Sequence, residues 1–240
     1  MNTLTGTSPK TMARATGALY LVTIIAGIIA QGFISTRFIS SGNGAATAGN
    51  ILANSPFYTL GFSIYMIEMA AQIGMTALFY ELLKPVNKSV ALLSAVFGYT
   101  GCGVKIVARL FYLAPLLMPG GSYSGVFSSE QQGSIVLLLL RLNDQGAAIA
   151  LIFFGFSTLL KGWLVIKSTF LPKWLGVLSF IGGIGWLAFL SPQLGRQLFP
   201  IIAVIGLVGS LATIAWLLVV GVNEEKWLEQ SAAAKASIWA

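Results

Sequence analysis

Six long apolar stretches, separated by short polar segments, dominate the pattern of residues along the chain. An α-helix needs about 20 mostly apolar residues to cross the hydrocarbon core of a bilayer. The pattern therefore predicts an all-α, polytopic membrane helix bundle with six transmembrane helices. These helices are expected at about residues 16–36, 57–83, 90–118, 143–166, 174–190 and 198–221. Residues 16–221 are expected to form a single domain, flanked by a polar segment (1–15) and a polar, poorly packed tail (222–240).

The first apolar stretch has two interpretations, because basic residues before an apolar run also occur in signal peptides. Lys10 and Arg14 precede a run over residues 18–33. That run is longer than the roughly 7–15 residues of a signal core. Five further apolar stretches follow it, so the pattern favours a transmembrane helix.

The segments between the spans contain further signals. Residues 37–56 are rich in Ser, Gly, Asn and Ala, and 45–53 is expected to form a short interfacial helix before a new helix start at Pro56. Basic turns with a proline, at 84–88 and 167–173, are expected to join neighbouring spans.

Two segments around the fourth span are harder to assign. Residues 120–132 are expected to form a loop, and residues 191–196 another one. The apolar piece 134–140 is too short to span a bilayer. It is expected to be an interfacial or re-entrant segment that leads into the fourth span.

Composition strengthens the membrane assignment and excludes several kinds of chemistry. The chain is 56% hydrophobic and 9% charged, whereas soluble domains carry about 25% charged residues. It has no histidine and one cysteine, Cys102, which removes Ser-His and Cys-His pairs, an internal disulfide and thiolate metal clusters. There is no glycine-rich phosphate loop or dinucleotide fingerprint. We therefore expect no cofactor and no metal, and we rank an enzyme last among the function classes.

The net charge of +7 follows from topology more simply than from nucleic-acid binding. With six spans both termini lie on one side. Nine basic residues fall on that side and three on the other, and such an excess marks the cytoplasmic side. We therefore expect cytoplasmic termini. The nine are Lys10, Arg14, Lys84, Lys88, Lys161, Lys167, Lys173, Lys226 and Lys235, and the three are Arg37, Arg141 and Arg196.

Four short stretches together resemble a bacterial membrane family known as domain of unknown function 4386. They are residues 13–21 (ARATGALYL), 45–53 (AATAGNILA), 82–88 (LLKPVNK) and 171–177 (LPKWLGV). The resemblance covers nearly the whole chain. It implies a six-helix, multi-pass protein of the bacterial cytoplasmic membrane. Because the family has no assigned activity, the resemblance transfers no catalytic residue.

Ionisable residues inside the predicted spans are the best indication of a functional site. Glu68 lies near the middle of the second span, and Lys105 and Arg109 lie one helical turn apart in the third. Charged groups in hydrocarbon are costly and normally face a protein interior. Glu68 and Lys105 lie at similar predicted depths, so we expect Glu68 to contact Lys105 or Arg109. In the alternative interpretation the third span ends near Arg109, and both cations extend to the outer headgroups.

Further polar residues are expected near the outer end of the bundle. Arg141 and Asp144 lie at the predicted start of the fourth span, where Asp144, or Asn143 in its place, is also a candidate N-cap. Gln31 and Gln72 lie on polar faces of the first and second spans. The candidate ligand-binding residues are therefore Gln31, Glu68, Gln72, Lys105, Arg109, Arg141 and Asp144.

The charge balance of these residues suggests a ligand. Three cations face two carboxylates, so one arginine is left without a counter-charge, and an arginine fork suits carboxylate or phosphate oxygens. In apolar surroundings the expected partner is an anionic amphiphile, such as a lipid. A small ligand-binding or transport-type membrane protein is therefore the first hypothesis. The alternative is a structural or regulatory subunit whose charges only fix helix packing. We expect the lipid bilayer as a partner and no nucleic acid, and a homo-oligomer is compatible with so few helices.

Overall fold

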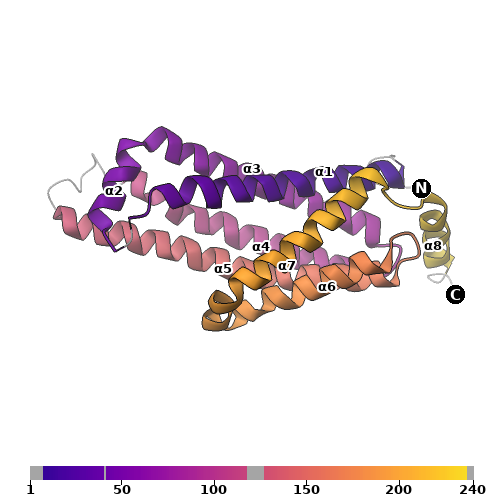
Figure 1. Ribbon diagram of the computed structural model, residues 1–240. Coiled ribbons are helices and arrows are strands. Elements are labelled where there is room, and N and C mark those ends of the chain that lie inside the picture. Colours follow the sequence, from indigo (N-terminus) through magenta and orange to yellow (C-terminus); the bar gives the residue numbers. More distant parts are fainter. Residues whose placement is uncertain (1–7, 41, 118–126, 237–240) are drawn as a thin grey trace. The chain divides into compact units, whose positions relative to one another are not determined.

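The computed structural model describes residues 8–40, 42–117 and 127–236, and this part of the chain is almost wholly helical (Figure 1). Its α-helices are α1 (Pro9–Gly27), α2 (Gly44–Ala53), α3 (Ser55–Leu83), α4 (Lys88–Leu113), α5 (Ser129–Lys167), α6 (Lys173–Leu187), α7 (Pro192–Val219) and α8 (Glu224–Ala236). Shorter helical turns extend three of them, at Ile28–Ile34 and Ser35–Arg37 after α1, at Ala114–Leu117 after α4, and at Ala188–Leu190 after α6.

Six of the helical stretches are long and apolar enough to cross a membrane, as the hydrophobic pattern predicts. They are Pro9–Arg37, Ser55–Leu83, Lys88–Leu117, Ser129–Lys167, Lys173–Leu190 and Pro192–Val219. The all-α class and the six membrane-spanning helices are thereby confirmed. The short helix expected at 45–53 is also present as α2, which begins after Asn43, whose side chain accepts a hydrogen bond from the Ala46 amide at 2.9 Å.

Three local expectations were wrong. Residues 134–140 are not a separate interfacial segment, because α5 continues through them for 39 residues. The last span begins at Pro192, where Ser191 caps the helix and proline occupies its first turn, so no loop runs from 191 to 196. Part of the loop expected at 120–132 lies outside the described residues, and α5 already begins at Ser129.

The C-terminal tail, expected to be poorly packed, forms helix α8, which packs against the rest of the chain through Trp227. Trp227 of α8 is 2% exposed, and its indole N–H donates a hydrogen bond of 2.9 Å to the carbonyl of Leu82. The first turn of α8 also contacts the first turn of α1, because the Lys10 amide donates to the Glu224 carboxylate at 3.1 Å. The beginning of α1 and the beginning of α8 therefore lie side by side (Figure 1). This proximity agrees with an even number of spans.

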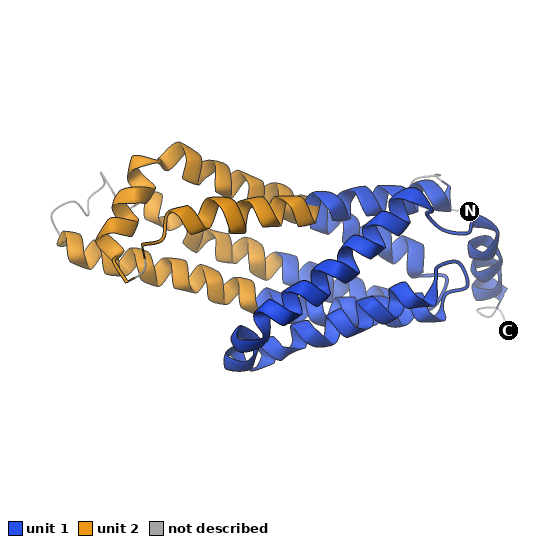
Figure 2. Ribbon diagram, viewed as in Figure 1, with its two compact units in different colours: residues 1–22, 71–102, 149–240 blue, residues 23–70, 103–148 orange. Residues whose placement is uncertain are grey.

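The chain forms two compact units that cut across the helices (Figure 2). Unit 1 contains residues 1–22, 71–102 and 149–240. Its apolar core draws on α1, α3, α4, α5, α6, α7 and α8, with Phe79, Leu164 and Leu217 among its buried members. Helices α5 and α6 approach closely, since a Cβ added to Gly162 would lie 2.5 Å from the Phe180 nitrogen. Glycine is needed there for backbone contact between the two helices.

Unit 2 contains residues 23–70 and 103–148. Its core is formed by the end of the first span together with α2, α3, α4 and α5, and it includes Ile51, Tyr58, Tyr65 and Tyr112. The charged residues among the candidate ligand-binding residues, Glu68, Lys105, Arg109, Arg141 and Asp144, all fall in this unit. Whether residues 16–221 act as one domain stays a prediction.

Candidate functional site

An ion pair joins α3 to α4 inside unit 2. The ammonium group of Lys105 donates to Oε1 of Glu68 at 2.5 Å, with side-chain exposures of 17% for Lys105 and 7% for Glu68. The contact predicted for Glu68 is thereby confirmed, with Lys105 as its partner. The carboxylate also packs on the first span, since a Cβ at Gly27 would lie 3.2 Å from Oε1. Its other oxygen, Oε2, is buried without a hydrogen-bond partner among the described residues.

Arg109 lies one turn further along α4 and is 1% exposed. Its guanidinium carbon lies 3.6 Å from the centre of the Tyr65 ring, and Nη1 donates to Oδ1 of Asn143 on α5 at 2.7 Å. Within the described part of the chain the Nε–H group has no hydrogen-bond acceptor. Arg109 is buried against side chains of unit 2, whereas the alternative interpretation has its side chain extend away from the bundle. Helix α4 continues to Leu113, and where the third span ends in a membrane stays a prediction.

The hydroxyl of Tyr65 connects the arginine to the first span. It donates to Oε1 of Gln31 at 2.6 Å and lies 3.0 Å from the Ser35 hydroxyl, which donates to the Ala30 carbonyl at 2.8 Å. Gln31 lies in a π-helical stretch, Ile28–Ile34. Such stretches are rare and occur frequently at functional sites. The wider turn here directs Gln31 and Ser35 to the same hydroxyl group.

Stacked tyrosines form the wall beside Arg109. The rings of Tyr58 and Tyr112 are parallel with centroids 4.2 Å apart, and the Tyr112 ring meets the Tyr65 ring edge-on at 5.4 Å. The Tyr58 hydroxyl donates to the backbone carbonyl of Tyr112 at 2.6 Å. This packing fixes the tyrosine ring on which Arg109 lies, so the cation is held in one position.

The remaining candidate residues, Asp144, Arg141 and Gln72, lie in different surroundings and make no direct hydrogen bond to Arg109 among the described residues. Asp144 is exposed and accepts a hydrogen bond from the Asn143 amide at 3.1 Å. It lies well inside α5, so the N-cap interpretation is wrong for both residues. Arg141 is exposed and makes no side-chain hydrogen bond to another described residue. Gln72 belongs to unit 1, where its carbonyl accepts a bond of 2.8 Å from Thr76.

Among the described residues of unit 2, the buried charged side chains are Glu68 and Arg109, and Lys105 is partly buried in its ion pair with Glu68. Asn143 stands between Arg109 and the exposed Asp144 and bonds to both. The arginine consequently has a neutral amide, rather than a carboxylate, as its direct partner.

Two features were missed by the reasoning from sequence. Asn143 was considered only as a cap, although its position two residues from Arg141, inside a long helix, makes it a possible partner for a buried cation. Lys161 was counted among the basic residues of the cytoplasmic side, but it lies within α5 and lines two small pockets of unit 1. The apolar run on either side of Lys161 was the available signal.

Comparison with known proteins places the chain in a family. The model of the family described as domain of unknown function, DUF4386, matches residues 15–221. The chain belongs to this family. An uncharacterized protein of Archaeoglobus fulgidus is 28% identical over 131 residues, which is 52% of this chain and 60% of that protein. No solved structure matches the chain. The resemblance noted in the sequence is thus confirmed.

Proposed function

We propose that this protein is a non-enzymatic, multi-pass protein of the prokaryotic cytoplasmic membrane that binds an anionic amphiphile, of the lipid class, at Arg109. The observation that supports the proposal is a guanidinium group that is 1% exposed and lacks a carboxylate partner among the described residues. A buried charge without a counter-charge is costly. Binding of an anion offsets that cost, and the same site would serve transport of the bound molecule.

The donor geometry favours an oxyanion. An arginine side chain offers five N–H donors in a planar fork. In Arg109 one nitrogen is bonded to Asn143, and the buried Nε–H has no acceptor among the described residues. Carboxylate and phosphate oxygens bind such a fork in pairs. The stacked ring of Tyr65 holds the fork in place, which lowers the entropy lost on binding.

The surroundings favour a ligand with a greasy body. Beside Arg109 on α4, Val107 is 57% exposed and Leu110 is 62% exposed, as expected of lipid-facing positions. The polar run 141–145 (RLNDQ) lies 22 or more residues before Lys167, about 33 Å along α5 at about 1.5 Å per residue. That length is about one bilayer core. With Lys167 at the cytoplasmic end, this run would lie at the outer headgroups and admit an anionic headgroup from the outer leaflet.

The second candidate is a structural or regulatory subunit. The Glu68–Lys105 pair favours it, because a cation that is already paired needs no ligand. In that case Arg109 would serve only to hold α3, α4 and α5 together through Tyr65 and Asn143. The two candidates differ in selectivity for anionic ligands.

Thermal unfolding in detergent separates them. The melting temperature of the parent protein should rise more with dioleoyl phosphatidylglycerol than with dioleoyl phosphatidylcholine, which has the same chains and no net charge. A shift of about 2–4 °C is expected for each kcal/mol of binding in a protein of this size. Soluble glycerol phosphate, added alone, tests whether the headgroup suffices without the chains.

Two variants complete this test. Arg109→Gln should lose the preference for the anionic lipid, whereas Arg141→Gln, which removes an exposed arginine, should keep most of it. Arg109→Lys retains the charge and should retain part of the preference, which guards against a general loss of fold. Equal stabilisation by both lipids in the parent would exclude the proposal and leave a packing role.

A further inference from the structure

Helix α8 docks at the end of unit 1 where α1 begins, and it contacts three separate segments there. The indole N–H of Trp227 donates to the carbonyl of Leu82, near the end of α3, at 2.9 Å. In the turn between α5 and α6, the Thr169 amide donates to Oε1 of Gln230 at 3.1 Å. The third contact is the bond between Glu224 and the first turn of α1. Helix α8 therefore ties α3, the α5–α6 turn and α1 together at this end.

The segments that α8 holds also form walls of two small pockets of unit 1, one of about 10 Å³ and one of about 30 Å³. Leu83, next to the carbonyl that binds Trp227, lines the smaller pocket. Leu171 of the α5–α6 turn lines the larger pocket, as does Val165, whose carbonyl accepts a bond of 2.8 Å from the Ser168 hydroxyl of the same turn. These pocket residues and Trp227 belong to one apolar cluster. Docking of α8 and the shape of both pockets are thus linked through the same side chains.

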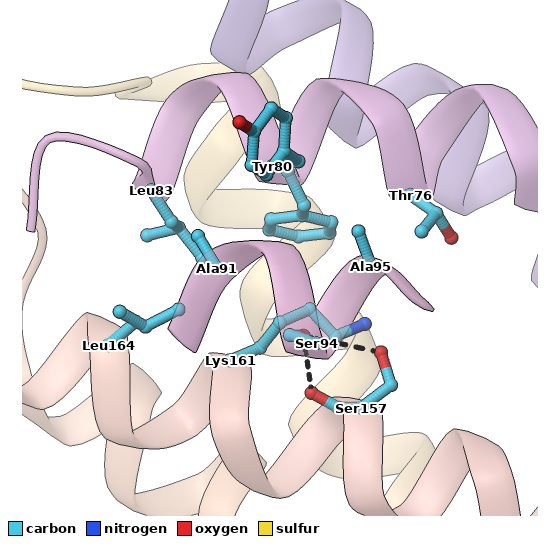
Figure 3. Close-up of a pocket in the computed structure, with 10 residues that line it drawn as sticks. Thr76, Tyr80, Leu83, Ala91, Ser94, Ala95, Ser157, Lys161 and Leu164 are labelled. Carbon is cyan, nitrogen blue, oxygen red and sulfur yellow. Dashed lines mark hydrogen bonds between the residues drawn. The ribbon is translucent and has the colours of Figure 1, made fainter. Parts of the chain in front are cut away.

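The smaller pocket has an apolar side and a polar side (Figure 3). The apolar side is a layer of three residues that are at most 2% exposed, Leu83, Ala91 and Leu164. They lie in the last turn of α3, the first turn of α4 and the last turn of α5, that is, toward α8. On the polar side the Ser94 hydroxyl donates to the carbonyl of Ser157 at 2.9 Å, and the ammonium group of Lys161 lies beside them. The apolar layer therefore stands between α8 and the polar groups.

Several features make α8 the part of unit 1 that is easiest to release. Trp227 is the buried residue of α8, and the hydrogen bonds of Glu224 and Gln230 lie at exposed positions. An isolated helix of 13 residues is marginally stable in water. Gly221, with φ of +76°, separates α7 from α8 and provides a turn at which the direction of the chain can change. Elements that move are drawn from such weakly held parts of a structure.

We propose that α8 is a latch, an element whose docking keeps this end of unit 1 closed. When docked, it holds the apolar layer and the α5–α6 turn in place. When undocked, it frees both and admits water and small solutes to Ser94, Ser157 and Lys161. The excess of basic residues predicts that this end is cytoplasmic, so the latch would open toward the cytoplasm. The proposal is independent of Arg109, which lies in unit 2.

The test measures access to a buried wall residue of the larger pocket. Val165, which is 7% exposed, is replaced by Cys in a Cys102→Ala background, and the rate of alkylation by iodoacetamide is measured on the detergent-solubilised protein. Adding Trp227→Ala should raise this rate by about tenfold or more, because loss of the buried indole increases the population of the undocked state. Leu228→Ala, at the next residue, which is 43% exposed, should leave the rate unchanged. Equal rates with and without Trp227→Ala would overturn the proposal.

The native thiol distinguishes release of α8 from a general loss of fold. Cys102 also lies in unit 1 and is 1% exposed, but it lines neither pocket. In a protein that retains it, Trp227→Ala should accelerate its alkylation far less than that of Val165→Cys. Equal acceleration of both thiols would mean that α8 stabilises the whole unit and is no latch. Trp227→Phe keeps an aromatic ring but removes the N–H donor, and it should accelerate alkylation of Val165→Cys to a smaller extent. If Trp227→Ala does not fold, the absence of acceleration in Trp227→Phe contradicts the proposal.

Discussion

The Glu68–Lys105 pair allows a quantitative test of how unit 2 is held together. Glu68→Gln preserves the size of the side chain but removes its charge, so it creates no cavity and takes the carboxylate away from Lys105. Removing one member of a buried ion pair typically costs about 3–5 kcal/mol. Lys105 is 17% exposed and can recover some solvation, which places the expected loss near the lower figure.

The double variant reveals the interaction itself. Lys105→Met also removes a charge and leaves Glu68, which is 7% exposed, without its cation. In Glu68→Gln with Lys105→Met no unpaired charge remains. Hydrogen bonds to charged groups contribute about 1.5–3 kcal/mol, so the double variant should be more stable than the sum of the single losses by about that amount.

The assay is reversible unfolding in mixed micelles, followed by circular dichroism, with all four proteins measured under one condition. The Lys84–Glu81 pair is the matched control. It has a similar distance of 2.6 Å, but Lys84 is 29% exposed and lies three residues after Glu81, just past the end of α3. Its coupling energy should stay below about 1 kcal/mol. Strict additivity at Glu68 and Lys105 would refute a stabilising pair.

Three further predictions follow from unit 1 and from the topology. Trp227→Ala empties a buried site and deletes an indole hydrogen bond, so it should lower the stability of the docked α8 by about 3–5 kcal/mol. Trypsin should then remove α8 faster than in the parent. Unchanged cleavage would show that α8 is not docked. Hydrogen bonds from the Ser8 hydroxyl and the Lys10 amide lower the pKa of Glu224 below its ordinary value of 4.5. The α1–α8 contact should therefore be present above pH 4.5 and be lost as the pH falls through the lowered pKa. Spin-label distances between α1 and α8 should therefore lengthen in acid, and Glu224→Gln should remove this pH dependence. In a Cys102→Ala background, an impermeant thiol reagent applied to intact cells should label Ala45→Cys and spare Ser89→Cys, and the reverse pattern would invert the predicted topology.

The hydrophobic pattern was sufficient to predict the spans, because a bilayer demands about 20 apolar residues from each helix. The same pattern did not predict the bounds of helices that are longer than a bilayer crossing. Helix α5 crosses its polar run at 141–145 without a break, since a helix satisfies its own backbone hydrogen bonds wherever polar side chains occur. The tail was misjudged for a related reason. The packing of Trp227 depends on a carbonyl 145 residues away, which no local pattern reveals.

The candidate site was predictable in part. Matched depth along neighbouring helices was enough to predict that Glu68 contacts Lys105 or Arg109, and the structure shows that the partner is Lys105. Depth along one helix did not show the direction of each side chain, so the contacts of Arg109 with Tyr65 and Asn143 required the structure. Lys161 was overlooked because a lysine near a helix end resembles a cation that extends to headgroups.

The most direct test of the central claim is an experimental structure of the protein purified in its native lipids. A phosphate or carboxylate group is expected within about 4 Å of the Arg109 guanidinium, a distance at which ion pairs are effective, with the apolar body of the ligand along α4 near Leu110. A well-ordered unit 2 in which Arg109 contacts only Tyr65 and Asn143, with neutral lipid chains outside, would contradict the claim and support a packing role for the charges.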